Sequence, residues 1–180
     1  MSWKELDSRI VYENRWIRVR EDAVVRPDGG EGIYGVVEMI SPAVFVVALT
    51  DADEVVLVAQ ERYTLGARSL EVPAGASDGE DPLVAARREL REETGLVAAE
   101  WRPLGRMNAL NGIANAPELV FLATRLAPAP EGDERHEEGI TDVLRVPFAE
   151  ALRMIAAGQI EDGETIAAIA FAGIALGRFA

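Results

Sequence analysis

Residues 80 to 96, EDPLVAARRELREETGL, combine a helix start, a helix stop and a group of closely spaced carboxylates. Asp81 can cap a helix whose first turn accepts Pro82, and Gly95 can adopt the left-handed conformation that ends one. This pattern predicts a helix between Asp81 and Gly95. At about 100° per residue, the carboxylates share an arc of about 100°, and a separate apolar stripe faces the core. The carboxylates are Glu89, Glu92 and Glu93, and the stripe is Leu83, Ala86 and Leu90.

Like charges at this spacing destabilise an isolated helix by a few tenths of a kcal/mol per pair, so the grouping needs a compensating partner. Divalent cations such as Mg²⁺ prefer carboxylate oxygens and bridge to phosphates, which makes a metal site one interpretation. The alternative is an exposed helix with many ion pairs, because Arg87, Arg88 and Arg91 alternate with the glutamates. The ordered run Arg-Glu-Leu-x-Glu-Glu-x-Gly-Leu, with Glu80 preceding it, is more constrained than a surface helix requires and favours a catalytic site.

Residues 75 to 96 resemble the Nudix box, in which Gly, five residues, Glu and seven residues precede Arg-Glu-aliphatic-x-Glu-Glu-x-Gly-aliphatic. Glu80, the spacer and the run from Arg88 to Leu96 fit this pattern. The loop from Gly75 to Gly79 is one residue shorter than the pattern. We interpret Gly75 as the equivalent glycine, because residues 71–75 resemble the strand end found in the ADP-ribose pyrophosphatase branch of the family.

Other segments resemble the same branch in the same order, so the resemblance covers most of the chain. They are residues 11–14, 26–29, 58–63 and 71–75, and a tail in which a strand at 142–146 precedes two helices around 161–165. The resemblance implies an α/β fold, an α/β/α sandwich with a mixed sheet and a small N-terminal antiparallel β-sheet segment. It implies that residues 1–40 form this segment and mediate a homodimer, while residues 41–180 form the hydrolase domain.

Hydrophobic periodicity and turn residues give the same reading of the elements. Alternating strands are expected over residues 8–37, with a turn at Pro27-Asp-Gly-Gly30, and a strand buried on both faces at 43–49. Further strands are expected at 55–59, 69–72, 101–107, 119–125 and 142–146, with helices at 148–157 and 164–176. Strands that alternate with helices predict a mixed sheet between helical layers.

Composition excludes several classes of function. At 180 residues and 49% hydrophobic content, the chain can bury a sizeable core. The net charge of −13 argues against binding to nucleic acid phosphates. No apolar run reaches membrane-span length, and the start does not resemble a signal peptide, so we expect no membrane partner. The chain has no cysteine, which is compatible with a cytoplasmic location.

The resemblance implies a metal-dependent hydrolysis of phosphoanhydride bonds, with Mg²⁺ as the expected cofactor and Mn²⁺ as the alternative. An acidic protein that cuts an anionic diphosphate must reverse its own field locally, and metal ions do so. By resemblance, Glu89 and Glu93 are the principal metal ligands, Glu92 shares the cluster, and the carbonyl of Ala74 completes it. Arg88 is expected to hold a glutamate in place, and Glu80 to play an accessory part.

A further glutamate, on a loop after the box, acts as base or positions the water in this branch. The candidate loop here is EGDERHEE, residues 131–138, and its candidates are Glu137 and Glu138. We favour Glu138, because a loop carboxylate has to reach the water that it deprotonates. His136, the only histidine, is interpreted as a surface residue.

Substrate contacts are expected from Arg62 and Arg68, which could bind phosphate, and from Glu71, which could accept from a sugar hydroxyl or base. Trp16 or Tyr63 could stack on a nucleobase, although aromatic residues also serve cores and dimer interfaces. A last contact is expected at Asn111, which stands where ADP-ribose hydrolases of the family carry a proline. The resemblance therefore implies a broader substrate class: a nucleoside diphosphate sugar, cut to a nucleoside monophosphate and a sugar phosphate.

Three alternatives stay open at this point. A housecleaning nucleoside triphosphate pyrophosphohydrolase would share the box but lack the N-terminal strands. A Nudix module that binds nucleotide sugar without cleaving it would not need Glu89, Glu92 and Glu93. An acidic interaction protein would not require the glutamates to stand at this spacing.

Overall fold

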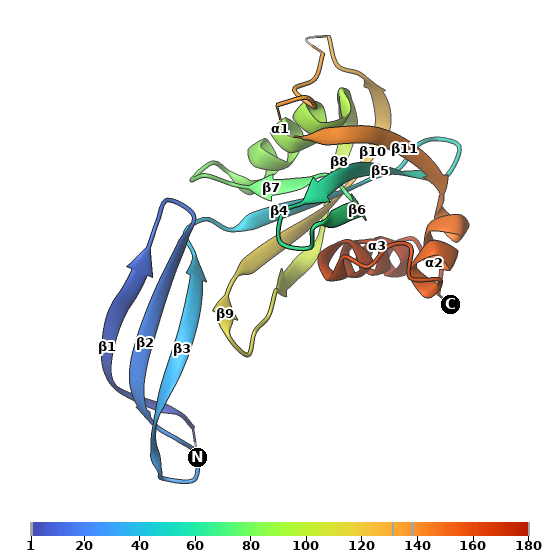
Figure 1. The fold of residues 1–180 in the computed structure, drawn as a ribbon. Helices are drawn as coiled ribbons and strands as arrows, with labels where there is room; N and C mark the ends of the chain where they lie inside the picture. The colour runs from blue at the N-terminus through green and yellow to red at the C-terminus, as the bar shows by residue number, and fades with distance from the viewer. Residues whose placement is uncertain (1, 131, 138, 180) are drawn as a thin grey trace. The chain divides into compact units, whose positions relative to one another are not determined.

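A computed structural model describes residues 2–130, 132–137 and 139–179, which form a mixed α/β protein with several sheets (Figure 1). The chain divides into two compact units. Unit 1 comprises Met1–Pro42 and Met107–Glu118, and unit 2 comprises Ala43–Arg106 and Leu119–Ala180. Segment 107–118 therefore packs with the N-terminal strands although it follows the box in sequence.

Unit 1 is built on an antiparallel meander of β1 (Lys4–Glu13), β2 (Ile17–Val25) and β3 (Glu31–Met39). The short strand β9 (Ala114–Asn115) pairs with β3 in parallel. The turn between β2 and β3 is closed by a hydrogen bond from Arg26 N to Gly30 O of 2.8 Å, and Gly29 takes a φ of 87°. This hydrogen bond confirms the predicted Pro27–Gly30 turn. The turn can form here because glycine adopts a positive φ without steric strain.

Polar side chains join the strands of unit 1 across its surface. Arg9 on β1 bonds to Glu21 on β2 at 2.6 Å, and Arg20 on β2 bonds to Glu38 on β3 at 2.6 Å. Every residue of β1 is exposed, and β1 lies at the edge of its sheet. The outer strand of unit 1 thus exposes both its side chains and an unpaired backbone edge.

Unit 2 has a buried centre. Strands β4 (Ala43–Ala48) and β5 (Glu54–Arg62) are almost entirely buried. Strand β5 pairs antiparallel with β11 (Ile140–Pro147) and β6 (Ala67–Glu71). A second sheet runs β7-β4-β10-β8, with β7 at Ala74–Ala76, β8 at Leu96–Asn108 and β10 at Pro117–Pro128.

Two helices, α1 (Pro82–Thr94) and α3 (Gly163–Ala175), contact β4, and Figure 1 shows them on opposite sides of the strand layer. The short helix α2 (Phe148–Ala156) follows β11 directly. Covering both faces explains why β4 reads as a continuous apolar run. The predicted α/β/α sandwich is therefore confirmed.

Helix α1 begins and ends where its sequence predicts. The Asp81 side chain accepts a hydrogen bond from Leu83 N at 2.9 Å, and Gly95 ends the helix with a φ of 69°. Ala86 and Leu90 are buried in the core cluster of unit 2. The carboxylate side is buried as well, with exposed fractions of 6% for Glu89, 8% for Glu92 and 5% for Glu93. An exposed helix with solvated ion pairs, the alternative reading of this segment, does not describe α1.

Helix α3 is tied to the strand that leads into the box. Asp162 caps α3 by accepting from Thr165 N at 2.7 Å. The Thr165 hydroxyl in turn accepts a hydrogen bond from Val72 N at 3.1 Å, and Thr165 is fully buried. The backbone between β6 and β7 therefore obtains its hydrogen-bond partner from the C-terminal helix. No helix in the described part of the chain is long and apolar enough to span a membrane.

Replacing Leu90 by alanine tests the packing beneath the acidic side of α1. Leu90 is completely buried, so Leu90→Ala should lower the free energy of unfolding by about 2–5 kcal/mol through lost burial and the cavity left behind. The matched control is Val84→Ala on the same helix, where the side chain is 50% exposed and a change within about 0.5 kcal/mol is expected. Urea denaturation measures both, and equal effects would contradict this packing.

Candidate active site

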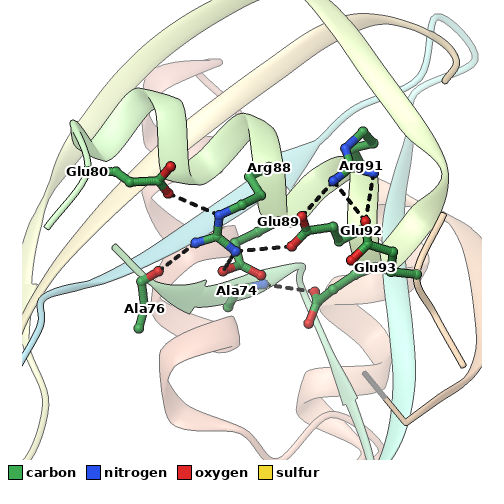
Figure 2. A network of polar contacts seen from close by, with 9 residues as sticks. Ala74, Ala76, Glu80, Arg88, Glu89, Arg91, Glu92 and Glu93 are labelled. Atoms are coloured by element: carbon green, nitrogen blue, oxygen red, sulfur yellow. Dashed lines mark hydrogen bonds and ion pairs between the residues drawn. The ribbon is translucent and has the colours of Figure 1, made fainter. Parts of the chain in front are cut away.

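Strand β7 and helix α1 meet through a glycine and two glutamates. A Cβ atom on Gly75 would lie 2.2 Å from Glu89 Oε1, so any larger residue would displace this carboxylate from its place against the strand. One residue earlier, Ala74 N donates to Glu93 Oε2 at 3.0 Å. The backbone of β7 thus fixes the positions of Glu89 and Glu93 (Figure 2).

The Arg88 side chain lies between α1 and β7 and connects the acidic residues (Figure 2). Its guanidinium donates to four oxygens. They belong to Glu80 at 3.0 Å, Glu89 at 2.8 Å, Glu92 at 3.0 Å and the Ala76 carbonyl at 2.9 Å. Burial lowers the pKa of Arg88, but the bond to Glu80 and the charge of Glu89 outweigh burial and raise the pKa. Charge-assisted hydrogen bonds of this kind compensate the burial of neighbouring carboxylates.

A second arginine neutralises part of the negative charge of Glu92 from its other side. Arg91 Nη2 donates to Glu92 Oε1 at 2.6 Å, and Arg91 also reaches Glu134 at 3.1 Å. Glu92 therefore lies between two guanidinium groups. The resulting cluster is anionic, buried and held in place from both strand and helix.

A second polar group lies on the neighbouring strands β5 and β6. Arg62 donates through Nε to Glu71 at 2.9 Å, and Gln60 donates to the same carboxylate at 3.3 Å. The bond to Glu71 raises the pKa of Arg62, and the charge of Glu93 adds to this effect. Arg62 therefore lies within electrostatic reach of the acidic cluster on α1.

The start of α3 adds acidic groups to this second polar group. The pKa of Glu164 is raised, first by burial and then by the negative charges of Asp162 and Glu71. The cation of Arg62 also interacts with Asp162. Strands β5 and β6 and the N-terminus of α3 thus bring a cation and several acids together beside α1.

The remaining predicted site residues belong to neither of these two groups. Arg68 is exposed and pairs with Asp142 at 2.8 Å. Trp16, stacked under the Arg15 guanidinium at 4.1 Å, and the exposed turn residue Asn111 both belong to unit 1. Their substrate contacts stay predictions.

The two candidate bases lie on the loop between β10 and β11. Glu137 is exposed, in a turn closed by a hydrogen bond from its N–H to Glu134 O of 2.8 Å. Glu138 lies outside the described residues. The assignment of the base to either residue stays a prediction.

Three features of the site went unnoticed in the sequence. These are the contact of Gly75 with Glu89, the pairing of Arg91 with Glu134 and the bond from Gln60 to Glu71. The shortened loop of the box was a signal for the first contact, because a glycine retained before a shortened loop suggests close backbone approach. The other two join residues whose spacing in the sequence carries no such signal.

Comparison with known families agrees with this geometry. Residues 3–37 match the family model described as nucleoside diphosphate sugar hydrolase N-terminal domain, and residues 39–169 match the NUDIX domain. The chain belongs to the Nudix family. The predicted resemblance is confirmed, and the chain is a pyrophosphohydrolase.

Individual relatives support the same assignment of this Nudix chain. An ADP-ribose pyrophosphatase of Mycobacterium tuberculosis is 35% identical over 93% of this chain and 81% of its own length. A GDP-mannose pyrophosphatase of an Enterobacter species is 36% identical over 55% of this chain and 52% of its own length. The crystal structure of an ADP compounds hydrolase shares the fold, with a TM-score of 0.82, 20% identity and coverage of 98% and 95% of the two chains.

Nudix hydrolases generally need a divalent metal, and the donors of this chain fit one. Glu89, Glu92 and Glu93 offer carboxylate oxygens, which hard divalent cations prefer, and Gly75 leaves space for Glu89 beside the backbone. Among the described residues, no group of three or more acidic, histidine or cysteine side chains stands at metal-coordinating positions, and Arg88 and Arg91 contact two of these glutamates. The chemistry of the donors therefore matches, while Glu89 and Glu92 contact arginine and Glu93 accepts a hydrogen bond from Ala74 N.

Filling the space at Gly75 tests whether Glu89 has to lie against the strand. Gly75→Ala would place a methyl group 2.2 Å from Glu89 Oε1, so the carboxylate must move. We expect turnover of a nucleotide sugar to fall by about 10²-fold, the effect of misplacing a catalytic group by about 1 Å. Gly35→Ala in β3, where a Cβ would meet nothing within 4 Å, serves as control and should keep wild-type activity. Normal turnover by Gly75→Ala, measured as product release, would contradict the role of this contact.

Proposed function

We propose that this Nudix enzyme hydrolyses the pyrophosphate bond of a nucleoside diphosphate sugar, releasing a nucleoside monophosphate and a sugar phosphate. The observation that carries the proposal is the buried acidic cluster of α1, held against β7 beside the cation of Arg62. ADP-ribose and GDP-mannose, named for the relatives, are the substrates we propose to test first. We propose Mg²⁺ as the metal, with Mn²⁺ as its substitute.

The glutamates of α1 would hold the metal. We assign Glu89 and Glu93 as principal ligands, Glu92 as a further member and the Ala74 carbonyl as a backbone donor. A bound divalent cation supplies neutralisation of phosphate oxygens and a lowered pKa of bound water. The protein fixes two of these carboxylates: Gly75 leaves space for Glu89 beside the backbone, and the Ala74 N–H donates a hydrogen bond to Glu93.

Protein groups would also handle the proton of the attacking water. We assign Glu92 and Glu93 as the catalytic carboxylates of α1. We assign Glu137 or Glu138, on the loop between β10 and β11, as the general base. A base on an exposed loop can approach the water as substrate binds. Glu137 is exposed and lies in a turn, which supports this assignment.

The substrate's diphosphate needs a cation that is both exposed and oriented. The side chain of Arg62 is 43% exposed, and it forms an ion pair with the buried carboxylate of Glu71, whose side chain is 6% exposed. We assign Arg62 to binding the phosphate. We assign Glu71 to orienting the Arg62 side chain and to accepting a hydrogen bond from a sugar hydroxyl or from the base. Arg68, on the following strand, is assigned a weaker phosphate contact because Asp142 already pairs with it.

Glutamine at position 93 tests the assigned cluster. Glu93→Gln keeps the size of the side chain and an acceptor for Ala74 N, but removes the charge, so the fold should persist. Turnover of ADP-ribose with Mg²⁺ should fall by about 10³-fold, as when a group that acts in the transition state is lost. Glu161→Gln, an exposed residue outside the cluster, is the control and should retain activity.

The assay measures product nucleotide by chromatography, with nucleoside triphosphates included in the substrate panel. Near-normal turnover by Glu93→Gln would overturn the assigned metal site. Cleavage of triphosphates in preference to nucleotide sugars would overturn the substrate class instead.

We propose that residues 1–40 mediate a homodimer and that residues 41–180 form the hydrolase domain. Strand β1 is exposed over its full length and forms an open sheet edge. Large apolar side chains are exposed on the same unit, which suits a second copy of the chain better than water. They are Trp3, Leu6, Ile10, Val11, Tyr12, Trp16 and Ile33. The cysteine-free composition suits the cytoplasmic location that we propose for the dimer.

A charge on β1 tests the dimer. Ile10, which is 56% exposed, lies on β1, so Ile10→Lys should place an unpaired cation in the interface and give the mass of a monomer in light scattering. Ile174→Lys on α3, where the side chain is 69% exposed, is the control and should keep the wild-type mass. A wild-type protein that is monomeric at micromolar concentration would contradict the proposal.

A further inference from the structure

The loop between β10 and β11 is fastened to the C-terminal end of α1. Glu134 N donates to Glu92 O at 2.9 Å, and Ala129 N donates to Gly95 O at 2.8 Å. Both contacts use carbonyl groups of the last helical turn and its cap, which have no partner within the helix. The loop thereby provides hydrogen-bond donors for the free carbonyl groups at the end of α1, and these bonds fix the position of the loop.

A side-chain bridge reinforces this attachment. Arg91 donates through both Nη atoms to Glu134 Oε1 at 3.1 Å, and through Nη2 to Glu92 Oε1 at 2.6 Å. One guanidinium therefore joins a carboxylate of the buried cluster to a carboxylate of the loop. Arg91 occupies the unspecified position between Leu90 and Glu92 in the Nudix box, so the family pattern assigns it no role.

The attachment lies close in sequence to the proposed base. Glu137 follows Glu134 by three residues in a turn closed at 2.8 Å, and the buried Ile140, which begins strand β11, donates through its N–H to Arg135 O at 2.9 Å. At about 3.5 Å per residue, the Cα atom of Glu137 stays within about 11 Å of the Cα atom of Glu134. Fixing Glu134 to α1 therefore limits where the Glu137 carboxylate can go.

We propose that Arg91 and Glu134 are positioning residues that hold the loop carboxylate near the acidic cluster of α1. The inference rests on the proposed function, because it gives the loop carboxylate its catalytic task. The bridge is partly exposed, with 24% of the Arg91 side chain and 45% of the Glu134 side chain accessible. Such a pair contributes modestly, so loosening it shifts the loop population without unfolding the protein.

Limited proteolysis tests the attachment independently of catalysis. Trypsin can cut after Arg135, and Glu134→Gln should speed this cleavage by about threefold, the order of a partly exposed ion pair. Glu150→Gln is the matched control, because Glu150 forms an ion pair with Arg153 on α2 at 43% exposure and should leave the cleavage rate unchanged. Mass spectrometry of the fragments identifies the cut. Unchanged cleavage in Glu134→Gln, or equal acceleration in Glu150→Gln, overturns the attachment.

Kinetics with ADP-ribose and Mg²⁺ then test the positioning role. Glu134→Gln should lower kcat by about threefold or more while KM stays within about twofold, because the loop acts on the reacting water and not on binding. Adding Glu134→Gln to Arg91→Gln should cause no further loss, since both changes break one bridge. Losses that multiply, or a change confined to KM, overturn the proposal. Inactivity of the wild-type enzyme would instead refute the proposed function, and the proteolysis result would still stand.

Discussion

The fold of the catalytic unit is organised around the need to keep three carboxylates buried on one side of a helix. Arg88 meets this need by donating to two of them, to Glu80 and to the backbone of β7. Removing its charge would leave buried anions without compensation, which is far more costly than losing a surface ion pair. Arg88 therefore ties α1 to β7, and the pairing of β7 with β4 and the bond from Ala74 N to Glu93 complete the connection.

The elements that could be predicted from sequence are those whose cause is local. Asp81, Pro82 and Gly95 act within one or two turns of α1, and the apolar run at β4 reflects cover on both faces. Strands β7 and β9 were not foreseen, because they are three and two residues long and exist only through pairing with distant strands. A periodicity of two cannot be recognised over so few residues.

The site divides in the same way between local and distant causes. The spacing of the glutamates on α1 follows from helix geometry, so their common side was predictable. Arg62 and Glu71 were each assigned to substrate separately, whereas the structure pairs them across β5 and β6. Glu134 meets Arg91 across 43 residues, and no sequence rule relates two surface charges at that separation. Partners of this kind emerge from the register of strands and from where a loop returns.

The hydrogen bond from Val72 N to the Thr165 hydroxyl bears on how the protein matures during synthesis. Its two residues are 93 positions apart, so the donor leaves the ribosome long before its acceptor. Helix α1 can form as soon as it emerges, but the Val72 N–H just before β7 obtains its partner within the protein only when α3 arrives. A chain stalled or truncated between residues 96 and 165 would contain the whole Nudix box and still lack a finished site.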